Sequence, residues 1–475
     1  MSKAHNPTEG ENSLSRTQRL SFICVLTGAA LSVLDSTAIA LASPSIAKEF
    51  DVPPSNVVLM MNAFQIAVLA MLLPLGIIGE RVGYRKIYLF GLTLFSISST
   101  LAFFTDSLIT LLIARVFQGI GAAGMMSVTT ALVRLIFSDA KLGKGLSTNS
   151  MVVAVASVAG PLFTASVLSM GSWRWIFALN AAIGIAAIAM ALVSLPRNPH
   201  QQERRSSATS FGIGFILNAV TFTLIFVGAN SLALGENVVN VSSAGWLTLG
   251  VGGVVACLYI WHQSRVSHPI LPLDVLKIPQ VSRTLGASVC AYCALTIAHL
   301  GLPFLLLETY KISTFETSFL LTGWPIAVVL VAPFAGRLIG RYPNGLLSSG
   351  GMLFLAMGLF SLALTPSEIT NFDPFWRIIL CGAGFALFQP PNYHSIITCT
   401  PSERSGAGSA MISVARLMGQ AVGGTLLATT YALCADQKGA AEMIGMLVAC
   451  GFALLAGVLS FLTPKATSHL GTASS

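Results

Sequence analysis

Apolar segments as long as a bilayer-spanning helix alternate with short polar segments along almost the whole chain. The hydrocarbon core of a bilayer is about 30 Å thick, and a helix of roughly 20 apolar residues crosses it. Fourteen segments have this length, so the pattern predicts fourteen transmembrane helices. They cover residues 20–43, 57–79, 87–105, 109–133, 145–170, 173–195, 209–229, 243–262, 282–307, 315–339, 345–365, 374–398, 405–430 and 440–462.

Two long polar loops, residues 196–208 and 264–281, divide the spans into groups of six, two and six. The segment from Gly76 to Lys86 after the second span has an echo in Gly336 to Arg341 after the tenth. This internal repeat predicts an all-α polytopic membrane protein with two six-helix repeats and two inserted helices, which is a plan typical of transporters. The expected parts are a tail (1–19), an N-terminal six-helix bundle (20–196), a loop with two extra transmembrane helices (197–265), a second loop (266–281), a C-terminal six-helix bundle (282–464) and a tail (465–475).

Composition excludes a soluble protein, because 54% of the residues are hydrophobic and only 9% are charged. If the N-terminus is cytoplasmic, nineteen of the 26 lysines and arginines fall in cytoplasmic segments and only four in outer loops. The positive-inside rule then places both tails in the cytoplasm. We expect a multi-pass protein of the plasma membrane, in this case a bacterial inner membrane. The net charge of +8 is therefore a topology signal and does not call for a nucleic-acid partner.

Asp35 lies past the midpoint of the first span and is the one acid well inside an apolar segment. A charge near the bilayer centre costs roughly 2.5–3.5 kcal/mol on insertion scales, so it is a functional hypothesis by default. Arg115, about seven residues into the fourth span, also needs a partner or a wet cavity. Low polarity favours a protonated carboxyl and a nearby cation favours the carboxylate, so alternating hydration would let Asp35 exchange a proton for a cationic substrate. The structural alternatives are a helix–helix hydrogen bond for Asp35 and snorkelling or a bond to backbone carbonyls for Arg115.

Nucleotide binding is not expected, although Gly119-Ile-Gly121-Ala-Ala-Gly124 fits the pattern G-x-G-x-x-G. No strand precedes these glycines, and in a membrane small residues more often allow close helix contact. The sequence also lacks a phosphate-binding G-x-x-x-x-G-K-[ST] motif. We therefore expect no ATP and no cofactor, with a proton gradient as the energy source. The loops lack an acid pair, a His/Cys cluster and a Ser/His/Asp set, so neither an enzyme nor a metal site is expected.

Several motifs stand in a fixed order at particular spans. They are Leu34-Asp35-Ser-Thr37, Gly76 to Lys86, Ala114-Arg115-Val-Phe-Gln118-Gly119-Ile-Gly121, Gly160-Pro161, Trp173-Arg174-Trp175-Ile-Phe177-Ala-Leu-Asn180, Phe388-Gln389-Pro390-Pro391-Asn392, Pro401-Ser-Glu403-Arg404-Ser-Gly406-Ala-Gly-Ser409 and Arg416-Leu-Met-Gly419-Gln420. In these motifs the chain resembles the fourteen-helix drug:proton antiporter branch of the major facilitator superfamily, from about Leu20 to Pro464. The resemblance implies that Arg115 is linked to proton movement.

The segment Gly76 to Lys86 looks like the superfamily's cytoplasmic gate. Glu80 stands where the family usually has Asp, and in the second-half echo Gly340 replaces the acid altogether. An acid here can pair with basic groups or a helix N-terminus across the cytoplasmic face, which would stabilise the outward-open state. The alternative is retention of topology by three basic residues. The gate residues are Gly76, Glu80, Arg81, Gly83, Arg85 and Lys86.

Gly160-Pro161 removes a backbone hydrogen bond from the fifth span and permits a bend. The resemblance associates this motif with export. The family's usual glycine pair after it is replaced by Thr164 and Ala165, and Ala40 stands where the branch usually has Asn.

Aromatic and polar residues in spans of both repeats are candidates to line a central substrate pocket. They are Phe64, Gln65, Phe304, Trp324, Phe388, Gln389, Asn392, Tyr393 and His394, and Glu308 is a further acid near the outer end of the ninth span. The alternative for each aromatic residue is a lipid-facing or core position.

The leading hypothesis is proton-coupled efflux of lipophilic, often cationic drugs, dyes or biocides by alternating access. The partners are then a small-molecule substrate and the lipid bilayer, and one copy of the chain is expected to suffice. The alternative within this class is an exporter of a specific metabolite, siderophore or lipid-like acid. A membrane enzyme or a receptor-like scaffold is less favoured, because no catalytic constellation is present.

Overall fold

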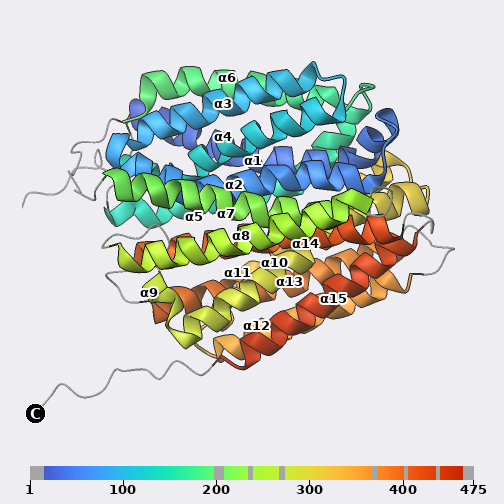
Figure 1. The fold of residues 1–475 in the computed structure, drawn as a ribbon. Helices are drawn as coiled ribbons and strands as arrows, with labels where there is room; N and C mark the ends of the chain where they lie inside the picture. Colours follow the sequence, from blue (N-terminus) through green and yellow to red (C-terminus); the bar gives the residue numbers. More distant parts are fainter. Residues whose placement is uncertain are drawn as a thin grey trace, which may run out of the picture.

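The computed structural model describes residues 15–137, 139–196, 208–233, 239–266, 273–365, 372–400, 405–434 and 439–463. Within these ranges the protein is built of helices, and the only β-type pairing is an isolated bridge between Ile339 and Tyr342. The helices are α1 (Arg16–Glu49), α2 (Pro54–Val82), α3 (Tyr84–Phe103), α4 (Leu108–Ile136), α5 (Asp139–Leu168), α6 (Arg174–Ser194), α7 (Ala208–Ala233), α8 (Val239–Arg265), α9 (Leu273–Leu276), α10 (Pro279–Phe304), the π-helical turn η2 (Leu305–Thr309), α11 (Thr314–Leu338), α12 (Asn344–Ala363), α13 (Phe372–Cys399), α14 (Ser405–Leu433) and α15 (Ala440–Phe461). The long helices run side by side along one axis (Figure 1).

By length and composition, twelve helices of the described chain can cross a membrane. The number is thirteen if the two parts of α5, Met151–Ser157 and Ala159–Leu168, which are bent by 41°, count as one span. The remaining long helix, α13, is not among them, because consecutive prolines and polar residues in its second half make it less apolar. The all-helical membrane architecture is thus confirmed, whereas the predicted count of fourteen spans is not.

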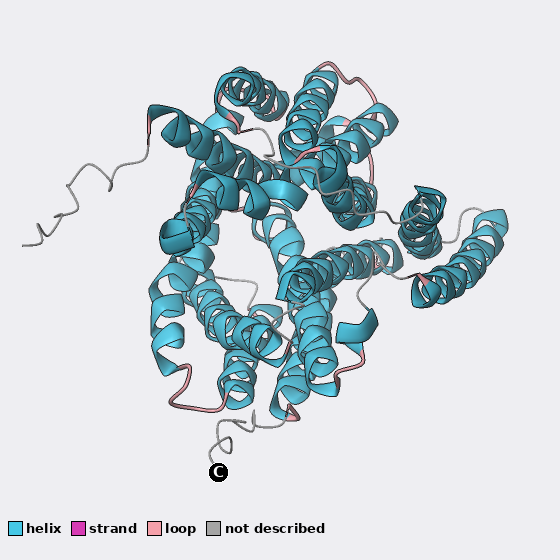
Figure 2. Ribbon diagram, turned by 90° about the vertical axis from the view of Figure 1, so that its left-hand side faces the viewer, coloured by secondary structure: helices cyan, strands magenta, loops and turns pink. Residues whose placement is uncertain are grey.

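The helices that precede α7 and those that follow α8 form two separate bundles (Figure 2). In the first, α4 packs against α2 and α3, α6 against α3, and α5 against α1. In the second, α13 packs against α11 and α12, α15 against α12, and α14 against α10. The two sets match helix for helix in order, as two repeats would.

Glycines make equivalent close contacts in both bundles. A side chain at Gly121 of α4 would collide with the α3 backbone at Gly91 and Phe95. A side chain at Gly384 of α13 would likewise collide with the α12 backbone at Gly351. These positions therefore need glycine so that two helix backbones can approach, which supports a packing role for the G-x-G-x-x-G segment.

The helices α7 and α8 pair with each other at one side of the two bundles (Figure 2). Helix α7 also contacts α2 of the first bundle and α14 of the second. Asn218 of α7 donates a hydrogen bond to the Ala70 carbonyl of α2 at 2.6 Å. The insertion therefore covers the seam between the two repeats.

We call the end of the molecule where α1 begins and α15 ends the termini end; it is the left end in Figure 1. The turns that join α2 to α3 and α11 to α12 use glycines with a positive φ, Gly83 at 115° and Gly340 at 85°. Only glycine adopts such angles without steric cost. Each repeat therefore uses a glycine in its turn after the second helix, although Gly340 aligns with Glu80 and not with Gly83 in the sequence echo.

Candidate functional site

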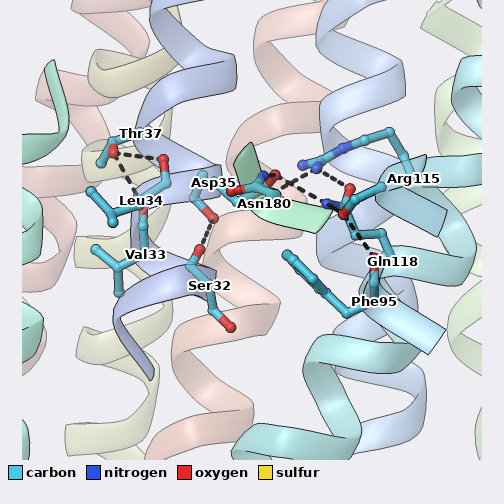
Figure 3. Close-up of polar contacts among 11 residues, drawn as sticks. Ser32, Val33, Leu34, Asp35, Thr37, Phe95, Arg115, Gln118 and Asn180 are labelled. Atoms are coloured by element: carbon cyan, nitrogen blue, oxygen red, sulfur yellow. Dashed lines mark hydrogen bonds and ion pairs between the residues drawn. The ribbon is translucent and has the colours of Figure 1, made fainter. Parts of the chain in front are cut away.

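Asp35 lies at the centre of a buried polar network in the first repeat (Figure 3). Its Oδ2 accepts a hydrogen bond from Arg115 Nη1 at 2.6 Å, which is also an ion pair. Its Oδ1 accepts from Asn180 Nδ2 at 2.7 Å and from Gln118 Nε2 at 3.1 Å. Helices α1, α4 and α6 thus converge on one carboxylate whose side chain is 0% exposed. Asp35 and Arg115, which the sequence singled out separately, are thus in direct contact in this conformation.

Gln118 connects the ion pair to a third helix. Its Oε1 accepts from Arg115 Nη1 at 2.6 Å, and its Nε2 also donates to Ser99 Oγ of α3 at 2.9 Å. Arg115 and Gln118 are three residues apart on α4, so both side chains leave the same face of the helix. The network therefore fixes the arginine from its own helix while it fixes the aspartate from two others.

Arg115 keeps one polar atom without a partner. Its guanidinium carbon lies 4.3 Å from the centre of the Phe64 ring, a cation–π contact with α2. Its side chain is 2% exposed, and its Nε is buried without a hydrogen-bond acceptor among the described residues. An unpaired N–H at such a depth is costly, so this atom is where water or a ligand is expected to bind.

A small cavity of about 40 Å³ adjoins Arg115 between the two repeats. A water molecule needs roughly 10–15 Å³ by such a measure, so the cavity has room for a few. The residues that line it are Ser36, Met61, Asn62, Gln65, Arg115, Thr296, Leu300 and Gln420. Helices from both repeats thus meet at the arginine, which lies between the cavity and the enclosed carboxylate.

Helix α5 backs onto α1 immediately beside this network. The Cβ that an alanine would add at Gly160 would overlap the Thr37 hydroxyl, two residues from Asp35. The bend of 41° in α5 lies between Ser157 and Ala159, directly before the Gly160-Pro161 pair. The motif therefore allows α5 to approach the part of α1 that holds Asp35.

Toward the end opposite the termini, the two repeats are joined by two buried hydrogen bonds. Asn62 Nδ2 of α2 donates to Thr425 Oγ1 at 2.9 Å and to the Ala421 carbonyl at 3.1 Å, both on α14. Apolar residues of the same region, Ile39 of α1 and Leu302 of α10, belong to one core that spans both repeats. The repeats are therefore closed against each other at this end.

The predicted gate residues lie at the termini end of α2 and α3. Glu80 and Lys86 are exposed there, and Arg81 and Arg85 are half-buried. Arg85 Nη2 donates to the Leu192 carbonyl at the end of α6. A Cβ added at Gly76 would be in van der Waals contact with Ser127 of α4. The segment is thus anchored within the first repeat, and its proposed role as a latch between repeats stays a prediction.

The second repeat holds an uncharged polar cluster. Tyr292 of α10 and Tyr393 of α13 share a hydrogen bond of 2.6 Å between their hydroxyls. Gln389 Nε2 of α13 donates to the Tyr292 hydroxyl at 2.9 Å. Asn392, one turn from Gln389, donates to Ser288 Oγ at 2.6 Å and has a buried Oδ1 without a partner.

The other predicted pocket residues lie elsewhere in this conformation. Phe304 and Phe388 are buried in the core of the second repeat, against Tyr431 and Phe385 respectively. Trp324 packs against the ring of His299. His394 is exposed and contacts Asn344. Glu308 is 51% exposed and pairs with Lys311. Of the predicted set, Gln65 lines the cavity directly.

Sequence reasoning did not assign roles to several residues that the structure brings to the site. Gln118 and Asn180 stood inside quoted motifs, and their amide groups at membrane depth were a usable signal. Asn62 carried the same signal within the second span but no motif. A second buried acid, Glu442, is 6% exposed beside Tyr431 in the first turn of α15, away from the cavity. Glu442 was not predicted from the sequence, because it lies near the end of a span.

Comparison with known proteins agrees with this architecture. The family model described as Major Facilitator Superfamily matches residues 25–424 and 284–474. The chain is 41% identical over 407 residues to "Uncharacterized transporter YebQ" of Escherichia coli, covering 86% of this chain and 87% of that protein. It is 27% identical to "Riboflavin transporter RibZ" of Clostridioides difficile, covering 87% and 88%.

More distant relatives include "Multidrug resistance protein Stp" of Mycobacterium tuberculosis, 24% identical, with 88% of this chain and 77% of that protein covered. Among solved structures, a POT family transporter in complex with a thioalcohol-conjugated peptide aligns with a TM-score of 0.70 at 15% identity, over 95% of this chain and 96% of that one. At this identity, the likeness to the POT family transporter concerns the fold alone. The chain therefore belongs to the Major Facilitator Superfamily of membrane transporters.

Proposed function

We propose that this protein exports small lipophilic molecules, drugs, dyes or biocides among them, in exchange for protons. The observation that carries the proposal is the Asp35–Arg115 ion pair, which is fully buried and adjoins the cavity between the repeats. The name of a multidrug-resistance relative supports the direction of transport. Both termini would face the cytoplasm, and neither ATP nor a second copy of the chain would be needed.

The proton is expected to bind at Asp35 Oδ2. The other oxygen, Oδ1, already accepts two amide hydrogen bonds, whereas Oδ2 is held by Arg115. Protonation of Oδ2 removes the acceptor and the negative charge that Arg115 needs. Loss of one partner of a buried ion pair destabilises the protein by roughly 3–5 kcal/mol, because the other charge stays buried without a partner.

Relief of this unpaired charge would drive the conformational change. Arg115 lines the cavity, so water that enters there can solvate the guanidinium once the carboxylate is neutral. The hydrated site with a protonated Asp35 and the dry site with the ion pair would then favour different relative positions of the repeats. A bound proton shifts the equilibrium between these two conformations by the difference in its binding free energy to each of them. Release of the proton on the other side restores the pair and resets the transporter.

Proteoliposomes that contain the purified protein and an internal pH dye test the proposal. Addition of a transported drug should cause a substrate-dependent movement of protons in the direction opposite to the drug. The matched variant Asp35→Asn should bind the drug but move no protons. Drug movement by the wild type that leaves internal pH unchanged would refute proton coupling.

A second candidate is export of one specific metabolite. The polar lining of the cavity favours it, since six of the eight residues there carry a hydrogen-bonding side chain. The name of the riboflavin-transporting relative is consistent with such a cargo. A transport profile limited to one chemical series would separate this candidate from broad drug export.

A further inference from the structure

The charge and hydrogen-bonding groups between the repeats define a class of substrate, if the protein is the proton-driven exporter proposed above. The inference starts from the cavity. None of the eight residues that line it is acidic, and its one charged group is Arg115. Asp35 does not contribute a free carboxylate, because its side chain is 0% exposed and both oxygens are occupied. A cation that enters the cavity therefore finds no free carboxylate to bind, because the one carboxylate nearby is already paired with Arg115.

Two buried polar atoms of the cavity residues have no partner. Arg115 Nε is a donor without an acceptor, and Asn62 Oδ1 is an acceptor without a donor. The side chains that carry them are 2% and 1% exposed. Buried polar groups in native proteins are nearly always satisfied, so this pair predicts a guest that accepts from the arginine and donates to the amide.

The helix faces that line the cavity continue toward the termini end. On α10 the residue one turn before Thr296 is Tyr292, and on α14 the residue one turn before Gln420 is Arg416. Residues four apart share a helix face. Tyr292 is bound by Gln389 and Tyr393 of α13, so an aromatic and amide surface extends the cavity in this direction.

Arg416 adds a second positive charge to this surface. It is half-buried and lies close enough to the Tyr292 hydroxyl to interact with it electrostatically. No carboxylate of the described chain forms an ion pair with it. The surface between the repeats thus carries two arginines, phenols and amides.

These charges disfavour both kinds of ion as the cargo of a proton antiporter. A cation finds no free carboxylate in the cavity and is repelled by Arg416, whereas the charge of Arg115 is balanced by Asp35. An anion at Arg115 would bind best when Asp35 is protonated, because the arginine is then free. Coupling between two ligands is reciprocal, so proton and anion would bind together and travel in the same direction. Antiport requires the reverse.

We propose that the preferred substrate is a neutral, planar aromatic molecule with a hydrogen-bond acceptor for Arg115 and a donor for Asn62. The cavity of about 40 Å³ is far below the roughly 300–1,000 Å³ of a drug-sized pocket. It takes only the polar edge of such a molecule in this conformation. The rings extend toward Tyr292 and Tyr393, and Arg416 excludes the cationic analogue.

Three compounds with one ring system test this class: acridone, which is neutral, 10-methylacridinium, a cation, and acridine-9-carboxylate, an anion. Binding to the purified full-length protein is followed by ligand fluorescence. Acridone should bind roughly tenfold or more tightly than 10-methylacridinium, whereas acridine-9-carboxylate should take up a proton when it binds instead of releasing one. In Arg416→Glu the preference for acridone over 10-methylacridinium should fall by roughly tenfold, and in Arg416→Gln by less. Arg265→Glu, the same charge change on the exposed face of α8, should leave the preference unchanged.

The result that overturns the substrate class is equal or tighter binding of 10-methylacridinium, release of a proton when acridine-9-carboxylate binds, or no binding of acridone. An unchanged preference in both Arg416 variants, with folding verified by size-exclusion chromatography, overturns the role of Arg416. Proton movement is measured separately in proteoliposomes. Acridone transport without proton movement would refute proton coupling and leave the substrate class standing.

Discussion

The two repeats each bury a polar cluster that links their first and fourth helices, but only one cluster is charged. In the first repeat the link between α1 and α4 is the Asp35–Arg115 ion pair at 2.6 Å. In the second repeat the link between α10 and α13 is the Tyr292–Tyr393 hydrogen bond, also 2.6 Å long. The geometry is alike, whereas the response to a proton differs. The second cluster contains no carboxylate, whereas the first contains one whose charge a proton can neutralise.

This difference suggests a division of labour between the repeats. The first repeat would hold the proton and the second would present the surface that recognises cargo. The cavity lies between them and is lined by both. A change in the first cluster should therefore alter coupling and stability, whereas a change in the second should alter affinity.

The largest expected effect is the loss of uphill transport in Asp35→Asn. The amide keeps the shape of the side chain but cannot exchange a proton, so efflux against a gradient should stop while membrane insertion is retained. Asp35→Glu should keep partial activity. Glu308→Gln is the matched control, since Glu308 is an exposed acid that pairs with Lys311. Drug accumulation in cells and dye extrusion from vesicles measure the effect; retained uphill extrusion by Asp35→Asn would place proton coupling elsewhere.

The next largest expected effect is a difference in stability between variants of the two clusters. Arg115→Met leaves the Asp35 carboxylate buried and unpaired, which we expect to cost about 3–5 kcal/mol. Gln389→Met removes neutral hydrogen bonds in the second cluster and should cost about 1 kcal/mol. Thermal unfolding in detergent compares the two variants under one condition. Equal losses would mean that the charged cluster is no more strongly coupled to the fold than the neutral one.

Conformational balance should respond oppositely at the two ends of the molecule. Asn62→Leu removes the hydrogen bonds between repeats and should favour opening at the end opposite the termini. Glu80→Ala or Arg81→Ala should favour opening at the termini end, if the gate segment latches the repeats there. Each change is worth roughly 1–3 kcal/mol. Spin-label distances across both ends measure it, and unchanged distributions in the Glu80 and Arg81 variants would leave that segment a topology signal.

The smallest expected effect is that of Tyr393→Phe. Loss of one hydroxyl removes a hydrogen bond worth about 0.5–1.5 kcal/mol, so substrate affinity should fall by roughly tenfold or less. The number of protons exchanged per substrate should not change, because the first cluster is intact. A titration of binding together with a flux ratio checks both parts. A changed proton ratio would contradict the division between repeats.

The sequence predicted the elements of the fold better than their contacts. Helix length and apolar content suffice to identify membrane spans, which is why the all-helical architecture was predictable. Apolar content does not identify α13 as a span, because a helix that packs inside a protein can contain Gln389, Asn392 and two prolines at membrane depth. Hydropathy measures the preference of a segment for lipid, and part of α13 packs against other helices and not against lipid.

For the site, the sequence identified Asp35 and Arg115, because ionised residues in apolar spans are rare and costly. It could not show that they touch, nor that Asn180 completes the carboxylate's hydrogen bonds from 145 residues away. The Asn62–Thr425 contact joins positions 363 residues apart. Such contacts depend on how the repeats dock, which one sequence does not reveal. The sequence also did not show which of the predicted aromatic residues lie in the core and which line the cavity, because both environments are apolar.

The central claim is that substrate binding displaces a proton from Asp35. Its most direct measurement is the number of protons released when a transported substrate binds to the purified protein in weakly buffered detergent solution, near the pH at which release is greatest. We predict close to one proton per bound substrate for the wild type and none for Asp35→Asn. Equal release by both proteins, or saturating binding to the wild type without any release, would contradict the account.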